Sequence, residues 1–94
     1  MKTIFVVVAY DIVSDRRRNM VVKVLKDYGV RVNYSVFECE IKRNFFPVLK
    51  EKLEAMIDKK QDSVLFYKLC MECQAKRDAI GTFTIEPAKD IISI

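Results

Sequence analysis

The residue whose type and position best suit chemistry is Asp11, which follows the short apolar run Ile4–Ala9 and Tyr10. A basic triplet, Arg16–Arg18, begins five residues later. A carboxylate beside arginines and the amide groups of a helix N-terminus could hold a hard cation and a phosphate together. Position alone also suits an ordinary turn or capping aspartate, and from position alone that structural role is favoured.

The sequence contains no histidine. This absence excludes Ser-His-Asp and Cys-His nucleophilic catalysis, histidine acid/base nuclease chemistry and histidine-ligated zinc. A phosphodiesterase made from this chain would therefore need oxygen-ligated Mg²⁺, with Mn²⁺ as the alternative. Because one aspartate supplies few ligands, we expect the Asp11 side chains of two subunits to share the metal with carbonyl groups and waters.

The positive charge lies in the first half of the chain. Residues 1–47 carry nine Lys or Arg against five Asp or Glu, whereas residues 48–94 carry eight of each. Arg16, Arg17, Arg18 and Arg31 belong to the basic half, and the planar donor fork of arginine suits phosphate oxygens. The pattern indicates a polyanionic partner, although a solvated basic face without a partner fits the charge equally well.

The cysteines do not indicate a metal or disulfide framework. Cys70 and Cys73 form a C-x-x-C pair, but structural zinc needs four ligands and only Cys39 remains to be added. We expect reduced, structural thiols. The chain enters a strand-like run without a basic leader and has no apolar run long enough for a bilayer, so we expect a cytoplasmic protein without a membrane partner.

Two kinds of element must position Asp11. The β-branched run Ile4–Ala9 predicts a strand buried on both faces and central in a sheet. Ser14 or Asp15 then caps a helix, and Gly29 is expected to end it in a left-handed conformation. The apolar stripe of that helix is Val21, Val24, Leu25 and Tyr28.

The second β region, Val30–Ile41, changes phase at Val36–Phe37, which predicts a bulge or bend that splits it into two strands. A second helix opens at Asn44, with Pro47 in its first turn. After a polar turn, Ser63–Leu69 is predicted to be another strand. The apolar stripe of the second helix is Phe46, Leu49, Leu53, Met56 and Ile57.

The order of elements is typical of an α+β, ferredoxin-like βαββαβ sandwich, with two helices on one face of an antiparallel sheet. Ninety-four residues make a single domain, residues 1–94. The alternating segment Gly81–Ile85 and the apolar tail Ile91–Ile94 are surplus to this fold. We expect residues 80–94 to form C-terminal strands that are exchanged in a homodimer. Tyr10, Tyr34 and Phe37 are expected to be core or interface residues and not platforms for stacking bases.

Two motifs resemble those of the Cas2 family of CRISPR-associated adaptation proteins. The first is Tyr10-Asp11-Ile12 with Asp15-Arg16-Arg17-Arg18, and the second is Arg31-Val32-Asn33-Tyr34-Ser35-Val36-Phe37-Glu38. Asp62-Ser63-Val64, which opens the strand before Tyr67 and Leu69, also resembles the family. The likeness extends over essentially the whole chain, and the paired motifs carry its specificity.

The resemblance implies a small ferredoxin-like homodimer that partners the Cas1 integrase in spacer acquisition and binds RNA or duplex DNA. It also implies a metal-dependent endonuclease, with Asp11 as the catalytic and metal-binding residue and Ser35 and Phe37 near the active site. Arg16, Arg17 and Arg18 match the basic residues that follow the first strand. Asn33 stands where many members have glutamine, and Asn19 where lysine or arginine is common.

Three functions remain open from the sequence. The first is a Mg²⁺-dependent phosphodiesterase that cuts single-stranded RNA, double-stranded DNA or both. The second is a non-catalytic architectural dimer that binds duplex DNA and bridges integrase subunits, with binding that weakens steeply as salt rises. The third is a generic ferredoxin-like dimer with another ligand, which the paired motifs disfavour.

Overall fold

The computed structural model describes residues 2–70, 72, 76 and 78–81. The expected C-terminal strands beyond Gly81, their exchange between subunits, and Cys73 lie outside these residues. The elements run β1 (Thr3–Asp11), α1 (Asp15–Leu25), β2 (Gly29–Asn33), β3 (Val36–Lys42), a 3₁₀ turn (Arg43–Phe45), α2 (Phe46–Met56) and β4 (Ser63–Leu69).

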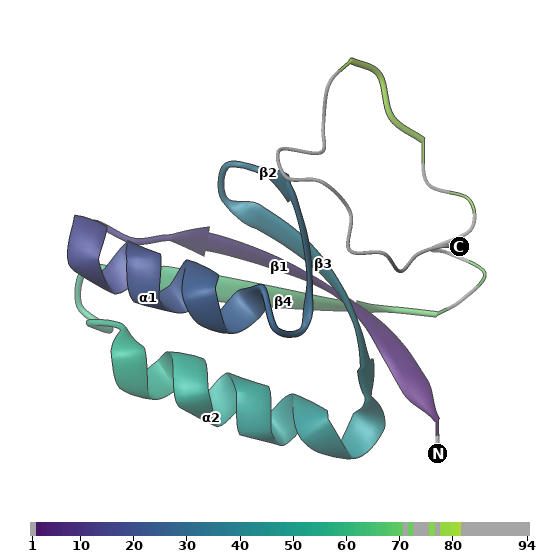
Figure 1. Ribbon diagram of the computed structural model, residues 1–94, viewed down its shortest axis with the longest axis horizontal. Coiled ribbons are helices and arrows are strands. Elements are labelled where there is room, and N and C mark those ends of the chain that lie inside the picture. Colours follow the sequence, from purple (N-terminus) through teal and green to yellow (C-terminus); the bar gives the residue numbers. More distant parts are fainter. Residues whose placement is uncertain (1, 71, 73–75, 77, 82–94) are drawn as a thin grey trace.

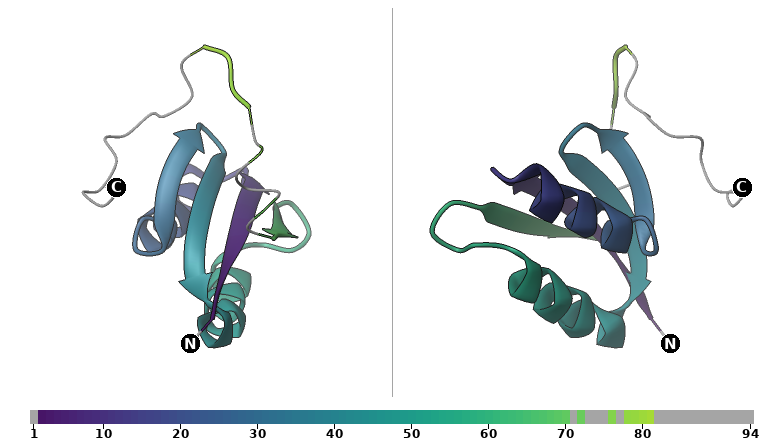
Figure 2. Two further views of the ribbon diagram at one scale, coloured as in Figure 1. Left: turned by 90° about the vertical axis from the view of Figure 1, so that its right-hand side faces the viewer. Right: turned by 60° about the vertical axis from the view of Figure 1, so that its left-hand side comes forward.

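The four strands form one antiparallel sheet in the order β2-β3-β1-β4. Both helices cover the same face of that sheet, as Figures 1 and 2 show. The arrangement confirms the α+β, ferredoxin-like sandwich predicted from the order of elements. It also confirms that the apolar run after Thr3 is a central strand, because β1 pairs with β3 on one side and β4 on the other.

The core lies between the sheet and the two helices. Alternate residues of β1, namely Val6, Val8 and Tyr10, face the helices and are buried. Phe5, Val7 and Ala9 point to the other face, where Phe5 is buried but Val7 and Ala9 are only half-buried. The second face of β1 is therefore only partly covered, whereas the sequence predicted burial on both faces. The largest fully buried side chains are Phe37, Leu25, Leu49, Leu53, Val6, Val8, Val21 and Cys39.

Helix α1 begins as predicted and ends earlier than predicted. The Ser14 hydroxyl accepts a hydrogen bond from the Arg17 amide at 3.2 Å, which makes Ser14 the N-cap. The helix ends at Leu25, and Gly29 is not a left-handed terminator but the first residue of β2. A Cβ at Gly29 would collide with the Glu38 carbonyl, so this position needs glycine for close approach to β3.

The second β region splits into two strands, as the change of phase predicted. The reversal is a turn at Tyr34–Ser35, just before the predicted break, together with a register shift between Arg31 and Asn33. A short 3₁₀ turn then precedes α2, so the helix opens at Phe46 and not at Asn44. Pro47 lies in the first turn of α2, where its missing N–H costs little.

Candidate functional site

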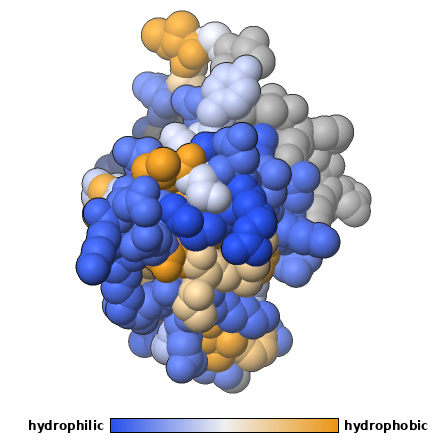
Figure 3. Space-filling view, turned by 90° about the vertical axis from the view of Figure 1, so that its left-hand side faces the viewer, coloured by the Kyte–Doolittle hydropathy of each residue, from blue (hydrophilic) through white to orange (hydrophobic). Residues whose placement is uncertain are grey.

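A pocket of about 440 Å³ lies where β1 ends and the β2–β3 turn meets the start of α1. It brings together three residues that the sequence placed in the site, which are Asp11, Ser35 and Arg18. Its remaining lining residues are Tyr10, Ile12 and Tyr34. Figure 3 faces this end of the molecule and shows hydrophilic side chains gathered across its centre.

Asp11 is exposed and is the last residue of β1. Its Cα is paired with that of Ser63 in β4, and the alternation of β1 places it on the sheet face that the helices leave uncovered. Within the described part of the chain, its carboxylate has no hydrogen bond or ion pair. The carboxylate therefore keeps its oxygens available for a ligand.

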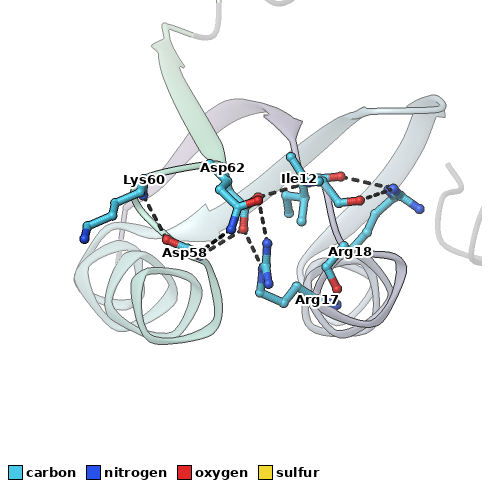
Figure 4. A network of polar contacts seen from close by, with 9 residues as sticks. Ile12, Arg17, Arg18, Asp58, Lys60 and Asp62 are labelled. Atoms are coloured by element: carbon cyan, nitrogen blue, oxygen red, sulfur yellow. Dashed lines mark hydrogen bonds and ion pairs between the residues drawn. The ribbon is translucent and has the colours of Figure 1, made fainter.

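Arg18 lines the pocket and also fixes the loop that follows Asp11. Its guanidinium donates to the Ile12 carbonyl at 3.1 Å and the Val13 carbonyl at 3.4 Å, and it forms an ion pair with Asp15 at 2.7 Å. The contact of Arg18 with the Ile12 backbone is visible in Figure 4. Arg18 thus ties the first turn of α1 to the backbone beside the candidate site.

The same loop is held from its other side by Asp62, whose side chain is fully buried. Its carboxylate accepts the Val13 amide at 3.0 Å, the Asp58 amide at 2.9 Å and the Arg17 Nε at 2.7 Å. Figure 4 shows Asp62 between the end of α2 and the start of α1. The hydrogen bond from Arg17, reinforced by the two amides, holds the pKa of Asp62 well below its usual range.

This Asp62–Arg17 cluster is a structural feature that the sequence analysis missed. Local patterns placed Asp62 only in a polar turn, because an ion pair that spans 45 residues leaves no local signal. The motif Asp62-Ser63-Val64 was the one available indication. Because Asp62 holds Val13, which is two residues beyond Asp11, the cluster positions the loop behind the candidate site.

The arginine triplet divides into three different roles. Arg17 turns inward to Asp62, and its side chain is only 23% exposed. Arg18 is engaged with Asp15 and the loop carbonyls, whereas Arg16 is exposed and forms no ion pair with the described residues. Arg16 is therefore the member of the triplet whose donors are most available to a phosphate.

Phe37 and Arg31 lie behind the pocket and do not line it. Phe37 is fully buried, and its ring centroid lies 6.3 Å from that of Tyr10, which does line the pocket. The guanidinium carbon of Arg31 lies 5.8 Å from the centre of the Phe37 ring. Phe37 can therefore support the site through Tyr10 but does not reach the space in front of Asp11.

Tyr10 connects the end of β1 to the β2–β3 turn. Its hydroxyl donates to the Tyr34 carbonyl at 2.9 Å, and its amide donates to the Ser35 carbonyl at 3.0 Å. Tyr10 is buried, as expected of a core aromatic residue, but Tyr34 is 78% exposed. Of the two places expected for Tyr34, core or interface, its exposure excludes the core of the described part of the chain, and an interface stays a prediction.

One subunit supplies few metal ligands. Among the described residues, no group of three or more His, Cys, Asp or Glu side chains is placed to hold a metal ion. Mg²⁺ is commonly held by one or two carboxylates and several waters, so two Asp11 carboxylates would fit it and one alone is a minimal site. Burial raises the pKa of Cys39 to about 12, which keeps it a thiol, and Cys70 is exposed.

In the part of the chain that the structure describes, no helix is long and apolar enough to cross a membrane.

The comparisons with known proteins agree with the motifs. The family model for CRISPR associated protein Cas2 matches residues 4–77. The chain is 52% identical over 86 residues to "CRISPR-associated endoribonuclease Cas2 3" of Chloroflexus aurantiacus, covering 88% of this chain and 91% of the relative. It is 41% identical over 81 residues to a Cas2 endoribonuclease of Thermus thermophilus, covering 86% of each chain.

Solved structures show the same fold. Streptococcus pyogenes Cas2 superposes with a TM-score of 0.74 at 36% identity, covering 82% of this chain and 99% of that one. A chain of a partial Cas6-RT-Cas1–Cas2 complex superposes with a TM-score of 0.71 at 24% identity, covering 95% of this chain and 99% of that one. The second likeness is one of fold alone.

Proposed function

The chain belongs to the Cas2 family of CRISPR-associated proteins, and we propose that it is a metal-dependent endonuclease that acts in CRISPR adaptation. The observation that carries the nuclease proposal is the Asp11 carboxylate, which has no partner among the described residues and lies in a pocket shared with Ser35 and Arg18. The names of the relatives support RNA as the substrate, since those from Chloroflexus aurantiacus and Thermus thermophilus are called endoribonucleases.

The uncovered face of the sheet supports a homodimer. Leu65 and Tyr67 are 55% and 53% exposed, and they pair across the sheet with Ala9 and Val7 on the face opposite the helices. An exposed apolar sheet face on a small domain is a surface for a second copy of the chain. Asp11 belongs to the same face, so packing two such faces together would bring the two Asp11 side chains toward one another.

The two Asp11 carboxylates would hold Mg²⁺, or Mn²⁺ in its place, with waters as further ligands. Such an ion, when bound, polarises a scissile phosphate and lowers the pKa of a coordinated water. The protein's own groups then orient the substrate. The Ser35 hydroxyl can donate to a phosphate oxygen, and Arg16 can pair with the phosphates of the nucleic-acid backbone. Arg18 keeps the loop after Asp11 in place.

The exposed Arg16 also favours a second role, in which the dimer binds duplex DNA and bridges subunits of the Cas1 integrase without cutting. Phosphate contacts of this kind position a duplex without any chemistry. A spacer-integration assay separates the two roles. Integration that survives Asp11→Asn but not Arg16→Ala indicates the architectural role, and integration lost with Asp11→Asn indicates that the chemistry is needed.

The nuclease proposal is tested by incubating the protein with labelled single-stranded RNA, single-stranded DNA and duplex DNA. We expect cleavage of RNA in Mg²⁺ or Mn²⁺ and loss of cleavage in EDTA, with activity restored when excess Mg²⁺ is added. Cleavage that is unchanged by EDTA would contradict the metal-dependent mechanism. Absence of cleavage on all three substrates in either metal would leave the architectural role.

The different surroundings of the three arginines predict different effects of their removal. We expect Arg16→Ala to weaken nucleic-acid affinity and to reduce the salt slope of binding by about 1, with little change in thermal stability. Arg17→Ala should lower the thermal midpoint, because it leaves the buried Asp62 without its cation. Fluorescence anisotropy over a salt series, beside thermal melts, measures both effects. Equal losses of stability would contradict the division of roles.

A further inference from the structure

The exposed aromatic ring at the site has no part in the chemistry proposed above. Tyr34 is the most exposed aromatic side chain among the described residues, at 78%. It lies in the wall of the pocket that contains Asp11 and Ser35, and not on the strand rows of the uncovered sheet face that we assign to dimerisation. An aromatic ring left in water beside a candidate phosphate site is a surface for an aromatic ligand.

The backbone that carries this ring is firmly held. The Tyr34 carbonyl accepts the Tyr10 hydroxyl at 2.9 Å, and the next carbonyl, that of Ser35, accepts the Tyr10 amide at 3.0 Å. The Tyr34 amide donates to the Asn33 side chain at 2.6 Å. The ring therefore projects from a turn that is fixed to the same strand end as Asp11, which reduces the entropy lost when a ligand stacks on it.

Resting on the proposed function, we infer that Tyr34 is a stacking platform for an unpaired nucleobase next to a phosphate bound in the pocket of Asp11 and Ser35. One sugar joins each base to its phosphate, so the base beside a phosphate in this pocket cannot lie far from the Tyr34 ring. In a single strand the faces of the bases are accessible, whereas in a duplex they are covered by neighbouring base pairs. Tyr34 thereby makes the site selective for single strands over duplexes.

The test separates stacking from cleavage by measuring binding in the Asp11→Asn background. The probe is a short single-stranded RNA with one 2-aminopurine, whose fluorescence reports stacking, and the same RNA annealed to its complement. We expect Tyr34→Ala to weaken single-strand binding about 10- to 100-fold and to leave duplex binding unchanged. Tyr34→Phe keeps the ring and should bind within about twofold of its parent. A single-stranded DNA of the same sequence shows whether the ribose adds to recognition.

Phe45→Ala is the matched control, because Phe45 is also an exposed aromatic residue, at 47%, but lines a different pocket. It should bind both probes as the parent does. Unchanged single-strand binding by Tyr34→Ala would overturn the inference, as would an equal loss on the duplex, which would indicate a damaged turn. If single-strand binding depends on Tyr34 but the wild-type chain cleaves nothing, the nuclease proposal fails and the stacking inference stands. A wild-type chain that binds neither probe and cleaves no RNA overturns both proposals.

Discussion

Asp11→Asn is expected to abolish cleavage while the protein stays folded. Replacing a carboxylate by an amide removes the negative charge that the proposed metal ion needs, and metal assistance supplies several kcal/mol to phosphodiester hydrolysis. Since each 1.36 kcal/mol corresponds to a factor of ten, the rate should fall by at least about 1,000-fold. The measurement is single-turnover cleavage of labelled single-stranded RNA in Mg²⁺.

The stability of this variant should be close to that of the parent. Asp11 is exposed and has no hydrogen bond or ion pair with the described residues, so nothing is lost in the fold when its charge is removed. We expect a thermal midpoint within about 3 °C of the parent value. A large drop in the midpoint would mean that Asp11 is a structural residue, which is the other role that its position in the sequence allowed.

Asp27→Asn is the matched control for the change in net charge. Asp27 is an exposed aspartate that lines a different pocket from Asp11. If both variants lose activity equally, the effect comes from the overall charge or from handling of the protein and not from the site. If Asp11→Asn cleaves as fast as the parent, the activity belongs to another group or to a contaminant.

Local patterns predicted most of the fold because the elements depend on local sequence. The strand Ser63–Leu69 was predicted with its observed bounds, and Ser14 was one of two expected caps for α1. The role of Gly29 could not be read in the same way. A glycine after a helical stripe is typical of a helix end, and only the pairing of β2 with β3 shows that its missing side chain makes room for Glu38 and Cys39.

The sequence predicted part of the candidate site, because local patterns placed its residues relative to the strands. Asp11 ends β1 and Ser35 lies in the turn just before β3, and the pairing of β1 with β3 brings the two residues together. The sequence could not assign different roles to Arg16 and Arg17. Neighbouring side chains on a helix point in different directions, and the partner that holds Arg17 lies far along the chain. The sequence also offered no reason for the exposure of Tyr34, which depends on where the β2–β3 turn projects.

Asp62→Asn is the change that we expect to cost the fold most. The buried carboxylate accepts hydrogen bonds from Val13, Asp58 and Arg17. An amide has the same shape but can accept with only one of its two ends, so an N–H group would face other donors and Arg17 would lose its counter-ion. The thermal midpoint at pH 7 should fall by on the order of 10 °C.

Glu54→Gln is the matched control, because it also converts a paired carboxylate to an amide. Glu54 pairs with Lys59 at 2.6 Å, but the two side chains are 54% and 68% exposed. Exposed pairs of this kind contribute little to stability, so the midpoint should hardly change. Equal shifts of the thermal midpoint in the two variants would show that burial is not the reason why Asp62 contributes to stability.

The pH dependence of stability in the parent and in Asp62→Asn tests whether the loss of stability comes from the charge of Asp62. The pKa of Asp62 is lowered in the folded protein, so its contribution to stability is fully present above the unfolded-state pKa, about 4. The contribution is lost as the pH falls from there toward the folded-state pKa, because the unfolded chain binds the proton first. The difference in the free energy of unfolding between parent and Asp62→Asn should therefore shrink between about pH 5 and pH 2. The lowered pKa of Glu54 is common to both proteins and cancels in this difference. Urea unfolding at pH 7 and pH 3 measures the difference in the free energy of unfolding between the two proteins. A difference that stays constant would mean that the variant acts through packing and not through the charge of Asp62.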